Sequence, residues 1–254
     1  MNISVYYCFP RSGGTLLNQC LLCHDQNVVL SEVNPAGSVI HPAQQAADWF
    51  DLIPDKATLE GLTKLPYLEV IAKIAEFSHR AGKTLCLRDW SGPNFFAGLS
   101  PWLDEPSLRL EQRLYLDHTL EARKEIVFLR RSRAVFASIK THVPECAELS
   151  MEHFSSVYRL FLRQTHDLPR FFFEDFVRDS ATQLEMICKA LGMAHAPDFS
   201  DRFSGESRVT GNTPLPRPTA SATWTEIRVP PSPRNEIPES PLFRELDLLA
   251  GYAD

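Results

Sequence analysis

The sequence predicts an α/β fold, in which a central parallel sheet is flanked by helices. Short apolar runs alternate with longer helix-like stretches, a glycine turn follows the first apolar run, and an arginine ends a later one. Such alternation is typical of a parallel sheet wrapped by helices. The 254 residues, 44% of them hydrophobic, are enough for one such domain. We therefore expect a single domain over residues 1–254.

Each element follows from its apolar pattern. The expected strands are Ile3–Phe9, Val28–Leu30, Thr84–Arg88, Ile126–Arg130 and Arg170–Phe173. The expected helices are Thr15–His24, Leu65–Ala81, Ser107–Arg123, Ser132–Lys140, Leu149–Asp167, Thr182–Leu191 and Pro241–Tyr252. Two stretches look irregular, Val33–Pro42 and the proline-rich Thr213–Pro241. The second, within 209–241, is too long for an ordinary connection and is expected to form a lid or a wrap over a cofactor.

The first apolar run leads into a turn with two adjacent glycines and then a leucine-rich helix, in the segment Phe9–Leu17. Backbone N–H groups of such a turn converge without clashes, and the helix N-terminus adds its dipole, so the turn predicts an anion site. The residues expected to hold the anion are Arg11, Ser12, Gly13, Gly14 and Thr15. This is not a Walker A loop, because no lysine occurs before Lys56. A plain turn that caps a helix remains the alternative.

A second anion-binding pattern lies between the fourth expected strand and the helix that follows it. Arg130 ends the strand and Ser138 lies two turns into the helix. A guanidinium and a hydroxyl in this arrangement can grip a phosphate from two sides. The alternative is that Arg130, with its neighbours Arg131 and Arg133, only solvates the end of the strand.

Together these motifs resemble the sulfotransferase family. Phe-Pro-Arg-Ser-Gly-Gly-Thr-Leu-Leu at Phe9–Leu17 is similar to the family's first motif. Phe-Leu-Arg-Arg-Ser-Arg-Ala-Val-Phe-Ala-Ser, which ends at Ser138, is similar to its second motif. A third stretch, Phe172–Met193, resembles a strand and helix common in bacterial members. The ordered matches extend from about position 9 to position 193.

The resemblance implies a co-substrate, 3′-phosphoadenosine 5′-phosphosulfate (PAPS), and no metal. The first motif would bind the 5′-phosphosulfate, with Arg11 on the leaving phosphate oxygen, and Arg130 and Ser138 would bind the 3′-phosphate. A late loop of bacterial members resembles Gly211-Asn212, which makes Asn212 and Arg217 expected cofactor contacts. A surface turn locked by prolines is the alternative for this loop.

The chain departs from the family pattern at two positions of the first motif. Arg11 stands where many cytosolic members carry lysine, although arginine is familiar in carbohydrate-type and bacterial members. Gly14 stands where a threonine is more usual. Neither departure removes the expected phosphate site, because arginine stays cationic and fork-shaped and Gly14 keeps its backbone N–H.

Sulfuryl transfer also needs a base that accepts the acceptor's proton. Glu32 follows the second expected strand, where several bacterial members place a catalytic glutamate. Asp89 follows the third, near the position where cytosolic members carry a histidine. Glu32 as an exposed loop carboxylate, and Asp89 as an ion-pair partner of Arg88 or a turn cap, are the alternatives. We expect Asp89 to be the base, with Glu32 as the second candidate.

Composition limits the partners and the compartment. The formal charge of −6 argues against a general nucleic-acid binder. The glycine turn begins too early to leave room for a signal peptide, and no apolar run approaches the ~20 residues of a membrane helix, so we expect a cytoplasmic protein without a membrane partner. The six cysteines fall mostly in apolar patterns that suit reduced core thiols.

The sequence thus predicts a PAPS-dependent sulfotransferase that acts on a hydroxyl or amine of a small-molecule or carbohydrate acceptor. A P-loop-type phosphotransferase (kinase) is one alternative, which the missing lysine disfavours. A catalytically inactive nucleotide-binding protein is the other. A homodimer is a possible assembly, by analogy with the family.

Overall fold

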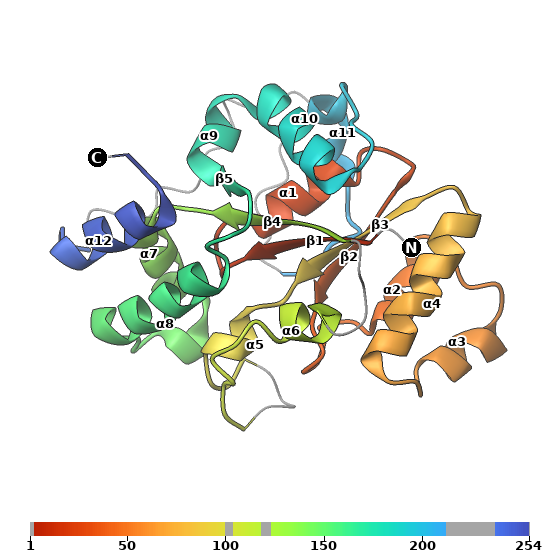
Figure 1. Cartoon of the computed structure of the whole chain (residues 1–254), viewed down its shortest axis with the longest axis horizontal. Coiled ribbons are helices and arrows are strands. Elements are labelled where there is room, and N and C mark those ends of the chain that lie inside the picture. The colour runs from red at the N-terminus through yellow and green to blue at the C-terminus, as the bar shows by residue number, and fades with distance from the viewer. Residues whose placement is uncertain (1–2, 100–103, 118–122, 212–236, 254) are drawn as a thin grey trace.

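A five-stranded parallel sheet forms the centre of the protein (Figure 1). The computed structural model describes residues 3–99, 104–117, 123–211 and 237–253. The strands, in sheet order, are β2 (Asn27–Val33), β3 (Thr84–Asp89), β1 (Ile3–Cys8), β4 (Arg123–Leu129) and β5 (Arg170–Phe172). The chain moves from β1 to one edge of the sheet and then returns past β1 to the other edge. In sheets of this kind ligands bind beyond the carboxyl ends of the strands, where the direction reverses.

Helices cover both faces of this sheet. Those of eight residues or more are α1 (Gly14–Leu21), α4 (Tyr67–Arg80), α7 (Ser132–His142), α8 (Met151–Gln164), α10 (Ser180–Leu191) and α12 (Pro241–Ala250). The shorter α-helices are α2 (Pro42–Asp48), α3 (Lys56–Leu62), α5 (Gly92–Phe95), α6 (Glu111–Asp117), α9 (Phe173–Arg178) and α11 (Phe199–Arg202). Single 3-10 turns follow α7 and α11, at Pro144–Cys146 and Phe203–Gly205.

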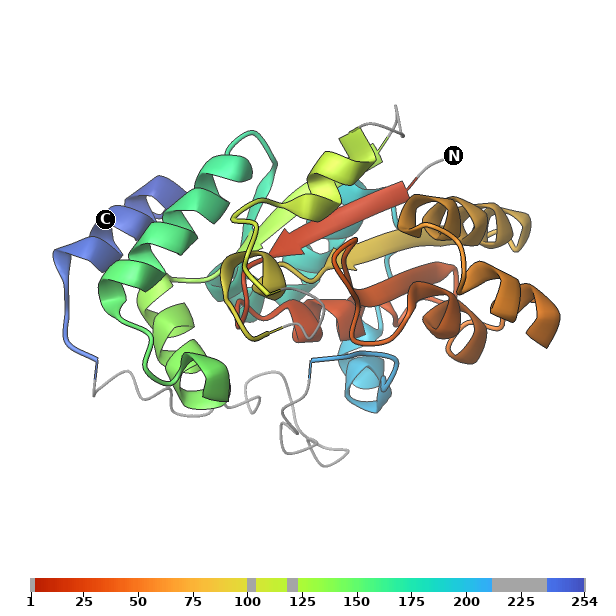
Figure 2. The ribbon, with the colours of Figure 1, turned by 90° about the horizontal axis from the view of Figure 1, so that it is seen from below.

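The two helical layers place the end of β1 at the middle of the fold. In Figure 1, α1, α10 and α11 lie above the sheet, and α5, α6 and α8 lie below it. Figure 2 shows β1 as a red arrow that points from the N-terminus toward the side where green α8 and blue α12 lie. Phe9, directly after β1, is fully buried and its ring meets those of Phe95, Tyr158 and Phe161. This aromatic cluster fixes the start of the glycine turn.

The predicted fold class is confirmed, and each expected strand is present. The expected helix Ser107–Arg123 was too long, because α6 begins only at Glu111 and Arg123 already belongs to β4. Phe173 was expected to end a strand but begins α9. The irregular stretch before Pro42 is confirmed, and most of Thr213–Pro241, the expected lid, lies outside the described residues.

Two further expectations concern the cysteines and the membrane. All six cysteines are buried and none forms a disulfide. None of the helices over the described ranges combines the length and apolar character that crossing a bilayer requires. The single domain, the cytoplasmic location and the homodimer stay predictions of the sequence.

Candidate active site

The glycine turn joins β1 to α1 at the centre of the sheet edge. Arg11 and Gly13 both take the left-handed backbone conformation, with φ of 68° and 93°, which reverses the chain within a few residues. The first N–H groups of α1 have no intrahelical partner, and no side chain caps the helix at Gly13. The Ser12 hydroxyl is buried and has no hydrogen-bond partner among the described residues. The turn therefore offers donors that an anion can satisfy.

The structure gives a physical reason for Gly14, the residue that departs from the family's usual threonine. A Cβ atom at this position would lie 2.5 Å from the Sγ of Cys8 and 3.1 Å from the Nε of Arg88. No side chain fits between these two groups without moving them. The backbone N–H of Gly14 stays at the helix N-terminus, so the expected anion donor is retained.

Arg11 links the glycine turn to the second predicted motif. Its Nε donates to the Oγ of Ser138 at 3.1 Å, and the Nη1 of Arg130 donates to the Arg11 carbonyl at 3.2 Å. The Arg130 guanidinium lies over the ring of Phe173, 4.7 Å from its centroid. The structure thus brings the two motifs, 119 residues apart in the chain, into direct contact.

A β-bulge in β2 shapes the neighbouring part of the site. Leu30 pairs with Leu87 and Val33 with Asp89, so two residues of β2 oppose the single residue Arg88. As a result both consecutive side chains meet Arg88. Its Nη1 donates to the Oγ of Ser31 at 3.3 Å and its Nη2 to the Oε1 of Glu32 at 3.0 Å. Glu32 takes φ of 51°, a strained value for a residue with a side chain.

Electrostatics tie this ion pair to the glycine turn. Burial lowers the pKa of the Arg11 guanidinium, Glu32 raises it and Arg88 lowers it further, with a net downward shift. Burial, the largest single influence, also lowers the pKa of Arg88, but Glu32 and then Tyr6 and Cys8 raise it, and together they outweigh burial, so the net shift is upward. Arg88 therefore stays charged, and both members of its pair lie within electrostatic reach of Arg11.

The segment that ends at Gly211 packs against the same groups. Arg88 Nη1 donates to the carbonyl of Thr210 at 3.2 Å, and the Thr210 N–H donates to the Oγ of Ser31 at 3.1 Å. The hydroxyl of Thr15 reaches the carbonyl of Gly211 at 3.5 Å. This late segment therefore closes the side of the site formed by β2 and α1.

Asp89 faces the other side of the sheet from this cluster, because successive residues of a strand point to opposite faces. Asp89 as a whole residue is 1% exposed, and its Oδ1 accepts a hydrogen bond from the Nδ2 of Asn34 at 3.1 Å. Burial raises the pKa of the Asp89 carboxyl to about 8, although the bond from Asn34 opposes the shift. The alternative in which Asp89 forms an ion pair with Arg88 was wrong, because Arg88 pairs with Glu32 instead.

The structure thus brings together most of the residues that the sequence singled out. Arg11, Glu32, Arg130 and Ser138 lie in or beside the glycine turn, whereas the side chain of Asp89 faces the opposite side of the sheet. Asn212 and Arg217 lie outside the described residues. Sequence reasoning missed Ser31 and Thr210, and no local signal could have found them, because a bulge and a contact over 179 residues unite them.

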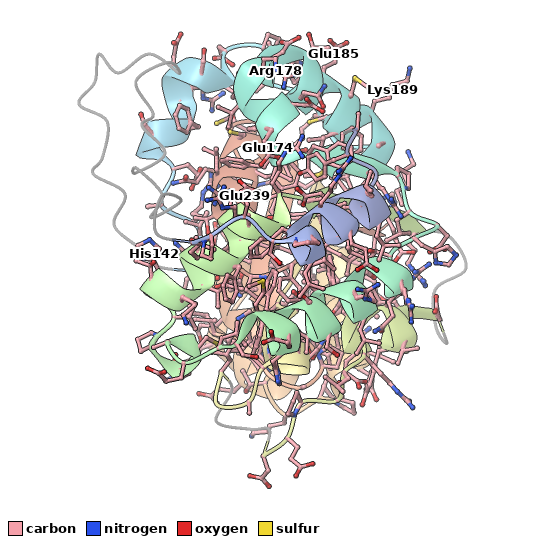
Figure 3. All side chains as sticks on the ribbon, turned by 90° about the vertical axis from the view of Figure 1, so that its left-hand side faces the viewer. His142, Glu174, Arg178, Glu185, Lys189 and Glu239 are labelled. Carbon is pink, nitrogen blue, oxygen red and sulfur yellow. The ribbon has the colours of Figure 1, made fainter. Side chains whose placement is uncertain are left out.

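A further titratable group, His142, lies within electrostatic reach of Arg11. His142, at the C-terminal end of α7 (Figure 3), has its pKa lowered by partial burial and then by the charge of Arg11. Over the described ranges no three His, Cys, Asp or Glu side chains converge as a metal site would require. The donors at the site are arginines, hydroxyls and backbone N–H groups, which suit phosphate and sulfate oxygens.

An all-parallel α/β sheet with a glycine turn at its central strand and a cationic cluster beside it is an arrangement suited to binding anions. Comparison with solved structures identifies the particular fold. The chain is similar to the sulfotransferase domain of the Synechococcus PCC 7002 olefin synthase, with a TM-score of 0.67 and 19% identity, over 98% of this chain and 93% of that one. It is similar to the sulfotransferase domain from the curacin biosynthetic pathway, with a TM-score of 0.65 and 15% identity, over 99% and 98%.

The protein therefore has the sulfotransferase fold, and the resemblance noted in the sequence is confirmed at that level. No protein-family model matches the sequence, and no curated protein does either.

Proposed function

We propose that the protein is a sulfotransferase that moves the sulfuryl group of PAPS to a hydroxyl or amine of a small-molecule or carbohydrate acceptor. The observation that carries the proposal is the contact between the two anion-binding motifs through Arg11, Ser138 and Arg130. A nucleotide with phosphates at both its 5′ and 3′ positions needs two neighbouring anion sites. The fold of the two sulfotransferase domains supports the same assignment.

The residues of the site fit PAPS, the sulfuryl donor. Ser12, Gly13, Gly14 and Thr15 would hold the 5′-phosphosulfate. The Ser12 hydroxyl, which has no partner in the described part of the chain, and the N–H groups of α1 would be the hydrogen-bond donors. Arg11 would neutralise charge on the phosphate oxygen as the sulfur–oxygen bond breaks. Arg130 and Ser138 would hold the 3′-phosphate. Asn212 and Arg217 remain proposed contacts of the late loop.

On the acceptor side we propose Glu32 as the base in preference to Asp89. Glu32 lies on the face of the sheet that carries the glycine turn, whereas the buried Asp89 faces away. The Glu32 carboxylate would accept the acceptor's proton as the acceptor oxygen or nitrogen bonds to sulfur. The electrons of the broken sulfur–oxygen bond would go to the departing phosphate. Arg88 would hold the carboxylate in place through Oε1.

The test is a calorimetric titration with adenosine 3′,5′-bisphosphate, adenosine 5′-phosphate and adenosine triphosphate, in the wild type and in Arg130→Ala, first without and then with magnesium. We expect tight binding only of the bisphosphate, no need for magnesium, and a loss of roughly 10-fold or more in Arg130→Ala, because a charge-assisted bond contributes about 1.5–3 kcal/mol. A preference for adenosine triphosphate with magnesium would instead indicate a phosphotransferase. Bisphosphate binding without turnover of PAPS on any acceptor would indicate an inactive nucleotide-binding protein.

A further inference from the structure

Three helices hold the backbone next to Arg130. The hydroxyl of Tyr158 on α8 donates to the Arg130 carbonyl at 3.1 Å. The next N–H, of Arg131, donates to the Oε1 of Glu174 on α9 at 3.1 Å. The N–H after that, of Ser132, donates to the Oδ1 of Asp247 on α12 at 2.8 Å. Every peptide group between Arg130 and the start of α7 is thus fixed by a side chain from elsewhere in the fold.

The two N–H groups belong to the N-terminal end of α7, where a helix has no partners of its own for them. Its N-cap residue, Arg131, supplies no side-chain cap. Carboxylates from two other helices take that place, and their charge also suits the positive end of the helix dipole. α7 is therefore anchored at its start by Glu174 and Asp247.

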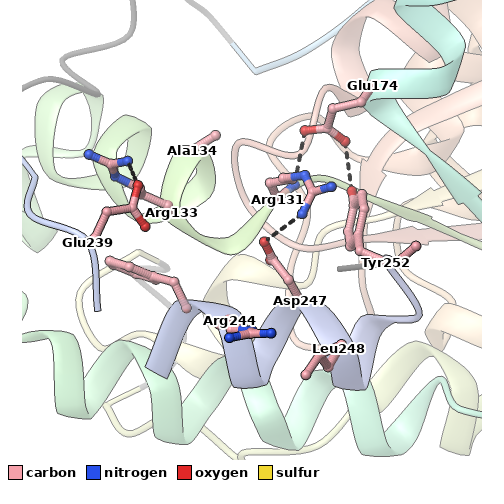
Figure 4. A pocket seen from close by; sticks show the side chains of 11 residues that line it. Arg131, Arg133, Ala134, Glu174, Glu239, Arg244, Asp247, Leu248 and Tyr252 are labelled. Carbon is pink, nitrogen blue, oxygen red and sulfur yellow. Dashed lines mark hydrogen bonds and ion pairs between the residues drawn. The ribbon is translucent and has the colours of Figure 1, made fainter. Parts of the chain in front are cut away.

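The C-terminal helix completes this anchor (Figure 4). The second oxygen of Asp247 lies 3.3 Å from the Nη1 of Arg131, whose guanidinium lies over the Tyr252 ring at 4.5 Å. The Tyr252 hydroxyl donates to the second oxygen of Glu174 at 2.7 Å. These groups line an open cavity of about 530 Å³ between α7, α9 and α12. Asp247 lies on α12 and Tyr252 lies just after this helix. This part of the chain therefore supplies one of the two carboxylates and holds the other, Glu174, through the Tyr252 hydroxyl.

We infer that Asp247 is a positioning residue for the phosphate grip formed by Arg130 and Ser138. Arg130 directly precedes the anchored N–H groups, and Ser138 lies on the helix that they begin. Fixing the start of α7 therefore fixes the separation between the guanidinium and the hydroxyl. This inference rests on the proposed function, since it assumes that Arg130 and Ser138 bind a 3′-phosphate.

The experiment compares the dissociation constants of adenosine 3′,5′-bisphosphate and adenosine 5′-phosphate, measured calorimetrically on the full chain. Asp247→Ala should weaken bisphosphate binding about fivefold, the factor that corresponds to a lost helix cap of ~1 kcal/mol, and leave adenosine 5′-phosphate binding unchanged. Asp247→Asn keeps an acceptor for the Ser132 N–H and should restore most of the loss. The matched control is Glu245→Ala, because Glu245 also lies on α12 but pairs with Arg159 of α8 at 2.6 Å.

The outcomes separate the inference from the proposed function. If the wild type itself does not prefer the bisphosphate, the proposed function is wrong. If the wild type has that preference and Asp247→Ala keeps it, or loses affinity for both nucleotides equally, the positioning role is overturned. Should Asp247→Ala not fold, Glu174→Ala decides in the same way, because it removes the α9 carboxylate and leaves α12 intact.

Discussion

The Nη2 of Arg88 lies 3.0 Å from the Oε1 of Glu32, and these side chains are only 8% and 12% exposed. An ion pair this far from solvent is costly to break at one end, because the remaining charge loses its partner. A test of Glu32 therefore has to remove its charge without removing its shape. Glutamine does so, since its amide oxygen can still accept from Arg88.

Glu32→Gln should lower turnover by roughly 10²-fold, the contribution expected of a general base, while the binding of adenosine 3′,5′-bisphosphate stays near that of the wild type. The measurement is the rate of PAPS consumption with a productive acceptor, together with the calorimetric affinity. Asp89→Asn is the control and should leave turnover nearly unchanged. The reverse result, loss of turnover in Asp89→Asn alone, would make Asp89 the base.

Gly211→Ala should displace Glu32. Gly211 has φ of 87°, and an added Cβ would lie 2.7 Å from the Oε1 of Glu32. We expect turnover to fall further than the loss of folded protein alone would explain. Gly82→Ala is a matched control: Gly82 has φ of 67° but no atom within 4 Å of an added Cβ.

Both variants carry the backbone strain of a left-handed alanine, which costs about 1 kcal/mol or more. Thermal denaturation should therefore show a loss of stability in both variants. Only the Gly211 variant should lose activity. Equal activities in the two variants would show that Glu32 does not depend on the space at Gly211.

Local sequence patterns predicted most of the fold. Each expected strand formed because its apolar run is bounded by polar or turn residues, and the Phe9–Leu17 turn followed from its two glycines. The short helices α2 and α3 were not predicted. Each has seven residues, too few for a clear helical period, although His41 and Asp55 cap their N-termini.

The site was predictable only in part, because some of its features depend on a bulge or on contacts between distant parts of the chain. Arg11, Arg130 and Ser138 lie in motifs whose spacing carries information. The preference between Glu32 and Asp89 depended on which face of the sheet each residue occupies. The bulge at Ser31 and Glu32 decides this for β2, and a bulge leaves no mark in the hydrophobic pattern. The anchoring of α7 by Asp247 joins positions 115 residues apart and has no local signal either.

The buried Asp89 makes stability depend on pH. Burial raises its pKa from 3.8 to about 8 in the folded protein, whereas the unfolded chain keeps a value near ~3.9. Between these two values the folded state binds a proton that the unfolded state has released. The contribution of Asp89 is therefore fully present below about pH 4, is lost as the pH rises through about 8, and changes by at most ~1.4 kcal/mol per pH unit.

Asp89→Asn should remove this dependence, because an amide stays neutral at every pH and its oxygen can still accept from Asn34. Urea denaturation from pH 5 to pH 9 measures the effect as the difference in the free energy of unfolding between variant and wild type. We expect the variant to gain stability relative to the wild type as the pH rises, and the gain to level off above pH 8. Asp55→Asn is the control, because Asp55 caps an exposed helix and the hydrogen bonds from Thr58 lower its pKa. Its titration falls below the measured range, so its difference from the wild type should stay constant. A constant difference for Asp89→Asn as well would mean that Asp89 is ionised in the folded protein throughout this range.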